Sequence, residues 1–196
     1  VCEGYVDVIA MHQAGFTNAV ASLGTAFTSQ HAMLLKRYTD QVILTYDSDG
    51  AGVKAALRAI PILKEVGMSI KVLNMKPYKD PDEFIKNLGK EEFQKRIDNA
   101  VGSFMFEISV IRNQYNMQDP ESKTGFYNAA AKKLLEFPEK LERDNYTEAV
   151  AREYMIPEAD LKNLVNSMGG LIGVTTRERE YDKERIRQKK EKEDGI

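Results

Sequence analysis

A short apolar segment runs directly into two carboxylates and two glycines at Val42-Ile43-Leu44-Thr45-Tyr46-Asp47-Ser48-Asp49-Gly50-Ala51-Gly52. An apolar run bounded by Asp and Gly is typical of a buried strand in a parallel sheet. Sites in open α/β sheets lie just beyond the carboxyl ends of such strands. This feature therefore predicts a strand that ends at a functional edge, followed by a helix over residues 53–66.

The two carboxylates of this segment suggest a metal site. Asp47 and Asp49 are two residues apart, so in extended backbone their side chains point the same way. Two such carboxylates repel unless a hard cation such as Mg²⁺ lies between them. Gly50 and Gly52 allow a tight turn into the helix. Asp, Ser and Gly are also ordinary turn residues, so a plain loop is the alternative for this motif taken alone.

Composition limits the classes of protein that this chain can represent. Its 196 residues are 42% hydrophobic, which suits one domain of usual size and a smaller one. The formal net charge of −2 gives no general basic field, so contact with nucleic acid would depend on a local patch or on metal ions. The single cysteine, Cys2, excludes an internal disulfide. Without a leader or an apolar stretch of about 18 residues, we expect a cytoplasmic protein with no membrane partner.

Strand and helix signals alternate along residues 1–100. Strand signals occur at 1–5, 18–24, 42–46 and 69–75, and helix signals follow at 6–14, 29–38, 53–66 and after the loop 77–84. This alternation predicts an α/β fold, in which helices cover both faces of a parallel sheet.

Beyond residue 100 the strand signals stop. Apolar residues recur at helical spacing over 101–170, which predicts a small all-helical subdomain whose aromatic residues form its core rather than stack on bases. After residue 175 positive and negative charges nearly cancel, as in a solvated helix or a linker. The expected division is therefore 1–100, 101–172 and a charged linker or tail at 173–196.

Acidic residues follow three of the predicted strands. Glu3 comes after the first, Asp47 and Asp49 after the third, and Asp80 and Asp82 after the fourth. Taken alone, Glu3 is an ordinary surface carboxylate and Asp80 a helix N-cap. The carboxyl ends of parallel strands share one edge, so we expect the five carboxylates to converge there. Such a cluster predicts a pair of Mg²⁺ ions of the kind used in phosphoryl transfer.

The order and spacing of these motifs resemble a known family. Glu3-Gly4-Tyr5-Val6-Asp7 and the segment 47–52 resemble a Toprim domain. Together with Ala19-Val20-Ala21-Ser22-Leu23-Gly24-Thr25 and Lys79-Asp80-Pro81-Asp82-Glu83, they resemble the bacterial replicative primases of the DnaG type over about residues 1–170. The resemblance implies a Toprim-like parallel sheet and a DNA-dependent RNA polymerase. Such an enzyme makes short primers on a single-stranded DNA template from ribonucleoside triphosphates.

The resemblance also implies roles for the acidic residues. Glu3 would be a metal ligand or an acid/base, and Asp47 and Asp49 would hold Mg²⁺, for which Mn²⁺ can substitute. Asp80 and Asp82 would complete the metal cluster, directly or through water. Glu3, Asp47 and Asp49 are thus the expected catalytic residues.

Other parts of the family's polymerase are expected outside this chain. A zinc-binding domain and a basic half of the polymerase core would precede Val1, and a domain that binds the replicative helicase would follow residue 196. Asp7 matches a family position near the site, with a supporting or a capping role. Without the basic half, the chain alone is expected to be inactive in primer synthesis.

Two other functions stay open at this point. Asp47 and Asp49 also resemble the nucleophile motif of haloacid-dehalogenase-like phosphatases, but that family has Thr where this chain has Ala51. A non-catalytic Toprim scaffold that bridges DNA and proteins is the second alternative. An EF-hand is excluded, because Ala51 and Arg58 fall at its fifth and twelfth loop positions, where oxygen ligands are required.

Overall fold

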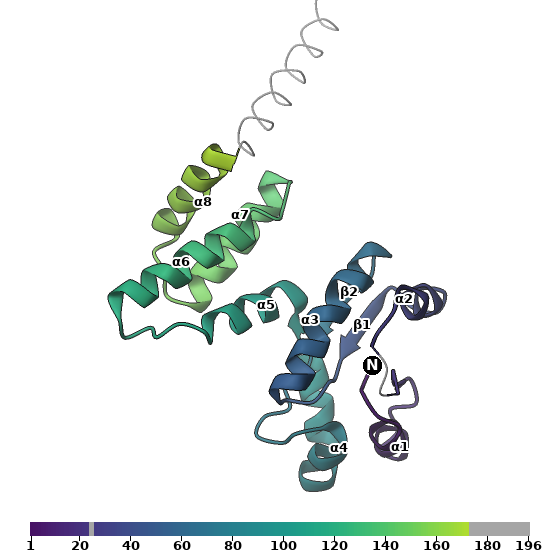
Figure 1. The fold of residues 1–196 in the computed structure, drawn as a ribbon. Coiled ribbons are helices and arrows are strands. Elements are labelled where there is room, and N and C mark those ends of the chain that lie inside the picture. The colour runs from purple at the N-terminus through teal and green to yellow at the C-terminus, as the bar shows by residue number, and fades with distance from the viewer. Residues whose placement is uncertain (24–25, 173–196) are drawn as a thin grey trace, which may run out of the picture. The chain divides into compact units, whose positions relative to one another are not determined.

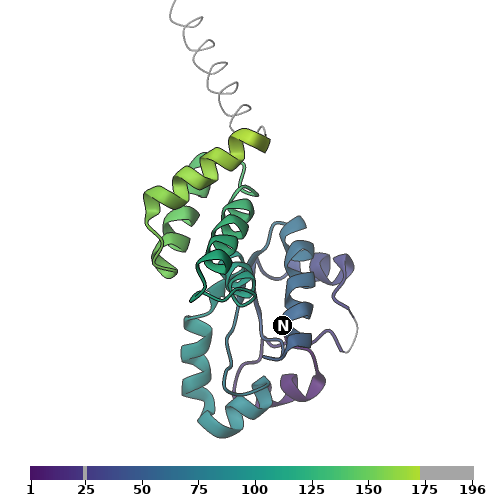
Figure 2. The ribbon, with the colours of Figure 1, turned by 60° about the vertical axis from the view of Figure 1, so that its left-hand side comes forward.

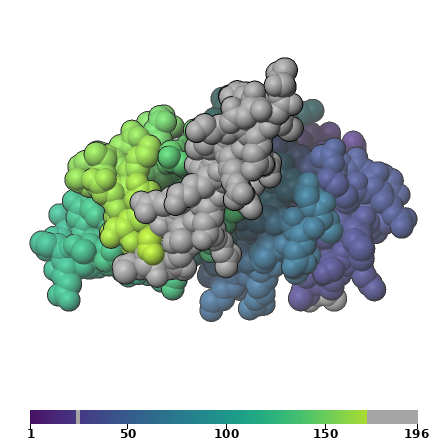
Figure 3. Space-filling model, turned by 90° about the horizontal axis from the view of Figure 1, so that it is seen from above, coloured from purple at the N-terminus to yellow at the C-terminus, as the bar shows by residue number. Residues whose placement is uncertain are grey.

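The computed structural model describes residues 1–23 and 26–172. The chain divides into two compact units, Val1–Glu107 and Ile108–Ile196, which are described separately here. Figure 1 shows the elements of both units, and Figure 3 distinguishes the units by colour, purple to teal for the first and green to yellow for the second. The charged tail predicted at 173–196 lies outside the described residues.

The sheet of the first unit has three strands in the order β1-β2-β3. β1 (Gln41–Leu44) and β2 (Ser69–Val72) are parallel, with Val42 opposite Ile70. β3 (Val101–Gly102) pairs with β2 in the antiparallel direction. The prediction that strands end near residue 100 was wrong for β3, because two residues are too short to show the alternation that marks a strand.

The N-terminal segment continues this hydrogen-bonded layer on the other side of β1. The Val1 amino group donates to the Ile43 carbonyl at 2.7 Å, and the Thr45 N–H donates to the Val1 carbonyl at 2.8 Å. Cys2 in turn forms an isolated parallel bridge with Ala21. The predicted segment 1–5 therefore lies beside β1, and the described part of the predicted segment 18–24 lies beside residues 1–5. Both are bridged segments and not full strands.

One face of the sheet is covered by α2 (Ser29–Lys36) and α3 (Gly50–Glu65). Ala32 of α2 and Ile60 and Leu63 of α3 are fully buried with the side chains of β1 and β2 that point to this face. The α3 helix presents a strongly amphipathic surface, because its buried residues recur every three or four positions.

The opposite face is covered by α1 (Tyr5–Gln13) and α4 (Pro81–Asp98). Met11, Phe84 and Phe93 form a second core cluster with Cys2. Figure 2 shows α4 as two helical segments that meet at an angle, which occurs at Gly89, where φ is +79°. Helices on both faces of an α/β sheet confirm the predicted fold class.

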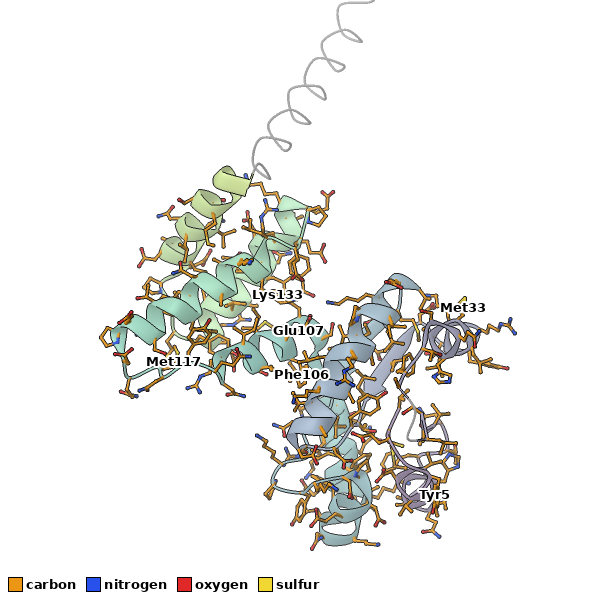
Figure 4. The ribbon with its side chains drawn as sticks, in the orientation of Figure 1. Tyr5, Met33, Phe106, Glu107, Met117 and Lys133 are labelled. Atoms are coloured by element: carbon orange, nitrogen blue, oxygen red, sulfur yellow. The ribbon has the colours of Figure 1, made fainter. Side chains whose placement is uncertain are left out.

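The first unit ends within α5 (Ser103–Arg112), because the division between the units falls after Glu107. Phe106 packs against the α2/α3 side of the core. Lys64 of α3 forms an ion pair with Glu107 at 3.0 Å. Figure 4 shows the labelled Phe106 and Glu107 beside α3.

The second unit is helical, as predicted. Its further helices are α6 (Pro120–Leu134), α7 (Lys140–Glu153) and α8 (Glu158–Ile172). Phe126 is fully buried, and its ring packs edge to face against that of Tyr154 with 5.1 Å between the ring centroids. These aromatic rings therefore form part of the core. The buried Arg143 donates to the Phe137 carbonyl at 2.6 Å and so joins the start of α7 to the preceding loop. Within the described ranges, no helix is long and apolar enough to cross a membrane.

Gly52 lies where the first turn of α3 approaches the end of β1. A Cβ atom placed on Gly52 would lie 2.0 Å from the Asp47 carbonyl oxygen, whereas a Cβ on Gly50 would meet no atom within 4 Å. The contact partner of Gly52 is backbone, which cannot rotate away as a side chain can. The position therefore requires glycine for lack of space.

We predict that Gly52→Ala lowers the free energy of unfolding by about 3 kcal/mol, because the backbone of Asp47 must shift to make room. The matched control Gly50→Ala should leave it unchanged or raise it by up to about 1 kcal/mol, because Ala favours the helix and meets no atom there. Urea denaturation of the two variants measures the difference. Equal stabilities would show that the close approach does not constrain the chain.

Candidate metal centre at the carboxyl edge of the sheet

The first two acidic motifs meet where β1 ends. The backbone N–H of Asp47 donates to Oε1 of Glu3 at 3.2 Å, although the two residues are 44 positions apart. The Asp47 side chain is 18% exposed, so it is mostly buried but still reaches solvent. The convergence of these motifs is what the parallel arrangement predicted.

Asp49 is the N-cap of α3. Its Oδ1 accepts the N–H groups of Ala51 and Gly52, both at 2.9 Å. An N-cap of this kind satisfies backbone donors that have no partner within the helix. One oxygen of Asp49 is thus committed to the helix, and a carboxylate offers a second oxygen to a cation.

The third acidic motif, Asp80 and Asp82, lies at the start of α4. Asp80 is the N-cap, and its Oδ1 accepts the Glu83 N–H at 2.8 Å. Asp82 forms an ion pair with Lys86 at 2.6 Å, one turn along the same helix. The loop before α4 is tied to the β1 loop, because the Ser48 N–H donates to the Lys79 carbonyl at 2.7 Å.

Asp7 supports the Glu3 turn, a role that the sequence left open. It is 8% exposed, and its Oδ2 accepts the Gly4 N–H at 3.3 Å. Burial, followed by the charge of Asp80, raises the pKa of the Asp7 carboxyl. Asp7 is therefore bonded to the Glu3 turn and lies within the electrostatic influence of the start of α4.

Negative charge accumulates along this edge. Burial raises the pKa of Glu3 above its ordinary value of 4.5, and the charges of Asp47, Asp49 and Asp7 raise it further. All the candidate metal ligands along this edge are carboxylate oxygens, which suit a hard divalent cation. Nevertheless, among the residues that the structure describes, no three His, Cys, Asp or Glu side chains form a closed set of metal ligands. The carboxylates share an edge and influence one another without forming a ready cage.

A pocket of about 220 Å³ adjoins Glu3. Its lining residues are Glu3, Ser22, Ala26, Phe27, Tyr46, Ala55 and Arg58. Tyr46 is buried in its wall and hydrogen-bonded to Ser22, and burial raises the pKa of the Tyr46 phenol to about 12. A carboxylate, a guanidinium and aromatic rings thus face one small space. Sequence patterns missed this pocket, because its walls come from four separate segments.

We predict a pH-dependent loss of stability that involves Glu3 in metal-free protein. Because the folded-state pKa of Glu3 is raised, its contribution to stability is fully present below about 4.5 and is lost as the pH rises through the raised value. Glu3→Gln keeps an oxygen acceptor for the Asp47 N–H but has no proton to lose. The free energy of unfolding of this variant should therefore fall less between pH 4.5 and 7.

Urea denaturation with a chelator present, at a series of pH values, measures this difference. Parallel stability curves for the wild type and Glu3→Gln would contradict the placement of Glu3 in a field of negative charge.

Comparison with known proteins assigns both units. Residues 1–85 match the family model of Toprim-like domains, and residues 104–159 match a model described as the DnaB-helicase binding domain of primase. The sequence predicted a helicase-binding part only after residue 196, whereas this match places a segment of that description inside the chain. The matches do not support the phosphatase alternative.

The chain is similar to named primases over most of its length. It is 38% identical to the DNA primase of Clostridium acetobutylicum over 167 residues, which are 85% of this chain and 28% of that protein. Among solved structures, the Aquifex aeolicus primase with its zinc-binding and RNA polymerase domains has a TM-score of 0.57 and 32% identity, over 82% of this chain and 38% of that one.

A second solved structure is a DnaG primase catalytic domain bound to single-stranded DNA. It has a TM-score of 0.61 and 29% identity, over 81% of this chain and 51% of that one. The chain thus spans about a quarter to a half of the proteins it resembles. The Toprim-like match, the primase match and these relatives agree, and the chain belongs to the family of bacterial DnaG-type DNA primases.

Proposed function

We propose that the first unit supplies the metal-binding catalytic edge of a DNA primase, a nucleotidyltransferase that makes short RNA primers on single-stranded DNA. The observation that carries the proposal is the contact between Glu3 and the Asp47 backbone at the end of β1. This contact joins two acidic motifs at the edge where α/β sheets bind ligands. Relatives named DNA primase, one of them solved with single-stranded DNA, support the same activity.

The acidic edge would hold divalent metal, Mg²⁺ or Mn²⁺. Asp47 and Asp49 are the proposed central ligands, with Glu3, Asp80 and Asp82 as further ligands, directly or through water. When bound, the metal would neutralise charge on a triphosphate and on the attacking 3′ oxygen. Asp49 and Asp80 each keep one oxygen on a helix cap, so each would offer its second oxygen to the metal.

Glu3 is proposed to handle a proton. A carboxyl group whose pKa is raised towards neutrality accepts and returns protons more effectively near physiological pH. In the metal-free protein, burial and the neighbouring carboxylates raise the pKa of Glu3, whereas a bound metal would lower it, so this role is the alternative to Glu3 acting as a ligand. The adjoining pocket, with Arg58 and Phe27 in its wall, offers a cation and an aromatic ring to part of a ribonucleoside triphosphate.

The proposed partners differ between the units. The net charge of −2 provides little attraction for a polyanionic template, so binding of single-stranded DNA would depend on basic segments of a longer protein. The match over residues 104–159 supports the replicative helicase as a partner of the second unit.

We predict that Asp47→Asn combined with Asp49→Asn weakens Mg²⁺ and Mn²⁺ binding at least about tenfold, because it removes two charged oxygen ligands. Titration calorimetry measures the affinities. The control is Asp40→Asn combined with Asp98→Asn, which removes the same charge from carboxylates elsewhere in the unit. Unchanged metal binding in the Asp47/Asp49 variant would refute the proposed ligands.

A further prediction concerns primer synthesis. The 196-residue chain alone should make no primers, whereas a longer protein that contains it should make them on single-stranded DNA with ribonucleotides and Mg²⁺. In that longer protein, Asp47→Ala should reduce synthesis about a hundredfold or more, because charge stabilisation at the reacting phosphate is lost. Primer synthesis by the isolated chain would contradict the need for basic segments, and an active Asp47→Ala protein would contradict the site.

A further inference from the structure

Lys79 places a positive charge beside the proposed metal ligand Asp47. Its Nζ lies 3.3 Å from Oδ2 of Asp47. The Asp47 side chain is 18% exposed and the Lys79 side chain 58% exposed, so the carboxylate is mostly buried while the lysine is largely in contact with solvent. The pair joins the loop after β1 to the loop before α4.

The backbone around Lys79 holds its side chain at this position. The Lys79 carbonyl accepts the Ser48 N–H at 2.7 Å, and the Lys79 N–H donates to Oε2 of Glu83 at 2.7 Å. Both the N–H and the carbonyl of Lys79 are thus hydrogen-bonded, and the carbonyl is bonded to Ser48, the residue that follows Asp47. The side chain therefore starts from a fixed point beside the acidic edge.

We infer that Lys79 is a built-in counter-cation of the metal centre, which occupies the Asp47 carboxylate in the absence of metal and lowers the affinity of the centre for divalent ions. This inference rests on the proposed function of the acidic edge. A divalent ion bound to Asp47 would lie within a few ångströms of the ammonium and repel it. Binding must therefore displace the Lys79 side chain, whose four-carbon stem is flexible enough to move.

The same arrangement stabilises the metal-free state. Repulsion among crowded carboxylates opposes folding, and a nearby ammonium offsets part of it. The Lys79 ammonium therefore neutralises part of the charge of Asp47 in the metal-free protein, and the metal ion takes over this role when it binds. Its effect on affinity is modest, because a half-exposed ion pair is screened by water and salt.

The test is titration calorimetry with MgCl₂ or MnCl₂ at low ionic strength. Lys79→Met and Lys79→Gln should bind the metal about three- to fivefold more tightly than the wild type, the size expected for one exposed ion pair. Lys79→Arg keeps the charge and should bind like the wild type. The control Lys95→Met removes a comparably exposed lysine that pairs with Glu92 instead, and should leave the affinity unchanged.

Two further measurements separate charge from structure. In about 1 M NaCl the advantage of Lys79→Met should disappear, because the Debye length falls to about 3 Å. Without metal, Lys79→Met should unfold at a lower temperature than the wild type. Added MgCl₂ should raise the midpoint temperature of unfolding more for Lys79→Met than for the wild type.

The outcomes distinguish this inference from the metal-centre proposal. If Asp47→Asn with Asp49→Asn binds metal like the wild type, the metal centre itself is wrong. If that variant loses binding while Lys79→Met and Lys79→Gln bind equally or more weakly than the wild type, only the role of Lys79 is overturned.

Discussion

The acidic edge of this protein depends on the close approach of the first turn of α3 to the backbone of Asp47. Gly52 leaves no room for a side chain between them, and Asp49 caps the same turn with two hydrogen bonds. These contacts fix the backbone of the loop after β1. Because the loop is fixed, the Asp47 N–H reaches Glu3 and the two acidic motifs stay together.

A second constraint is the negative charge that this geometry concentrates. Burial and neighbouring carboxylates raise the pKa of both Glu3 and Asp7, so the edge is unfavourable when fully ionised. Three features reduce the cost. Backbone N–H groups donate to the carboxylates, Asp49 and Asp80 lie at the positive ends of helices, and Lys79 pairs with Asp47. These features offset part of the repulsion between the carboxylates.

The two units divide the proposed work. The first carries the carboxylates and the pocket beside Glu3, and it matches Toprim-like domains. The second has a helical core built from residues such as Phe126 and Val150, and it matches the helicase-binding model. The primase family relates both units to one process, for which we propose metal chemistry in the first unit and a protein partner for the second.

The sequence by itself determined the α/β class, the helices on both faces and the helical second unit, because these follow from local periodicity and helix caps such as Thr28 and Asp80. It also placed Glu3 and Asp47 at one edge, since the ends of parallel strands coincide. Only the tertiary structure decided that the first and second predicted strands meet in a single bridge between Cys2 and Ala21, that β3 exists, and that Lys79 pairs with Asp47. These features arise from contacts between distant segments, which local sequence patterns do not encode.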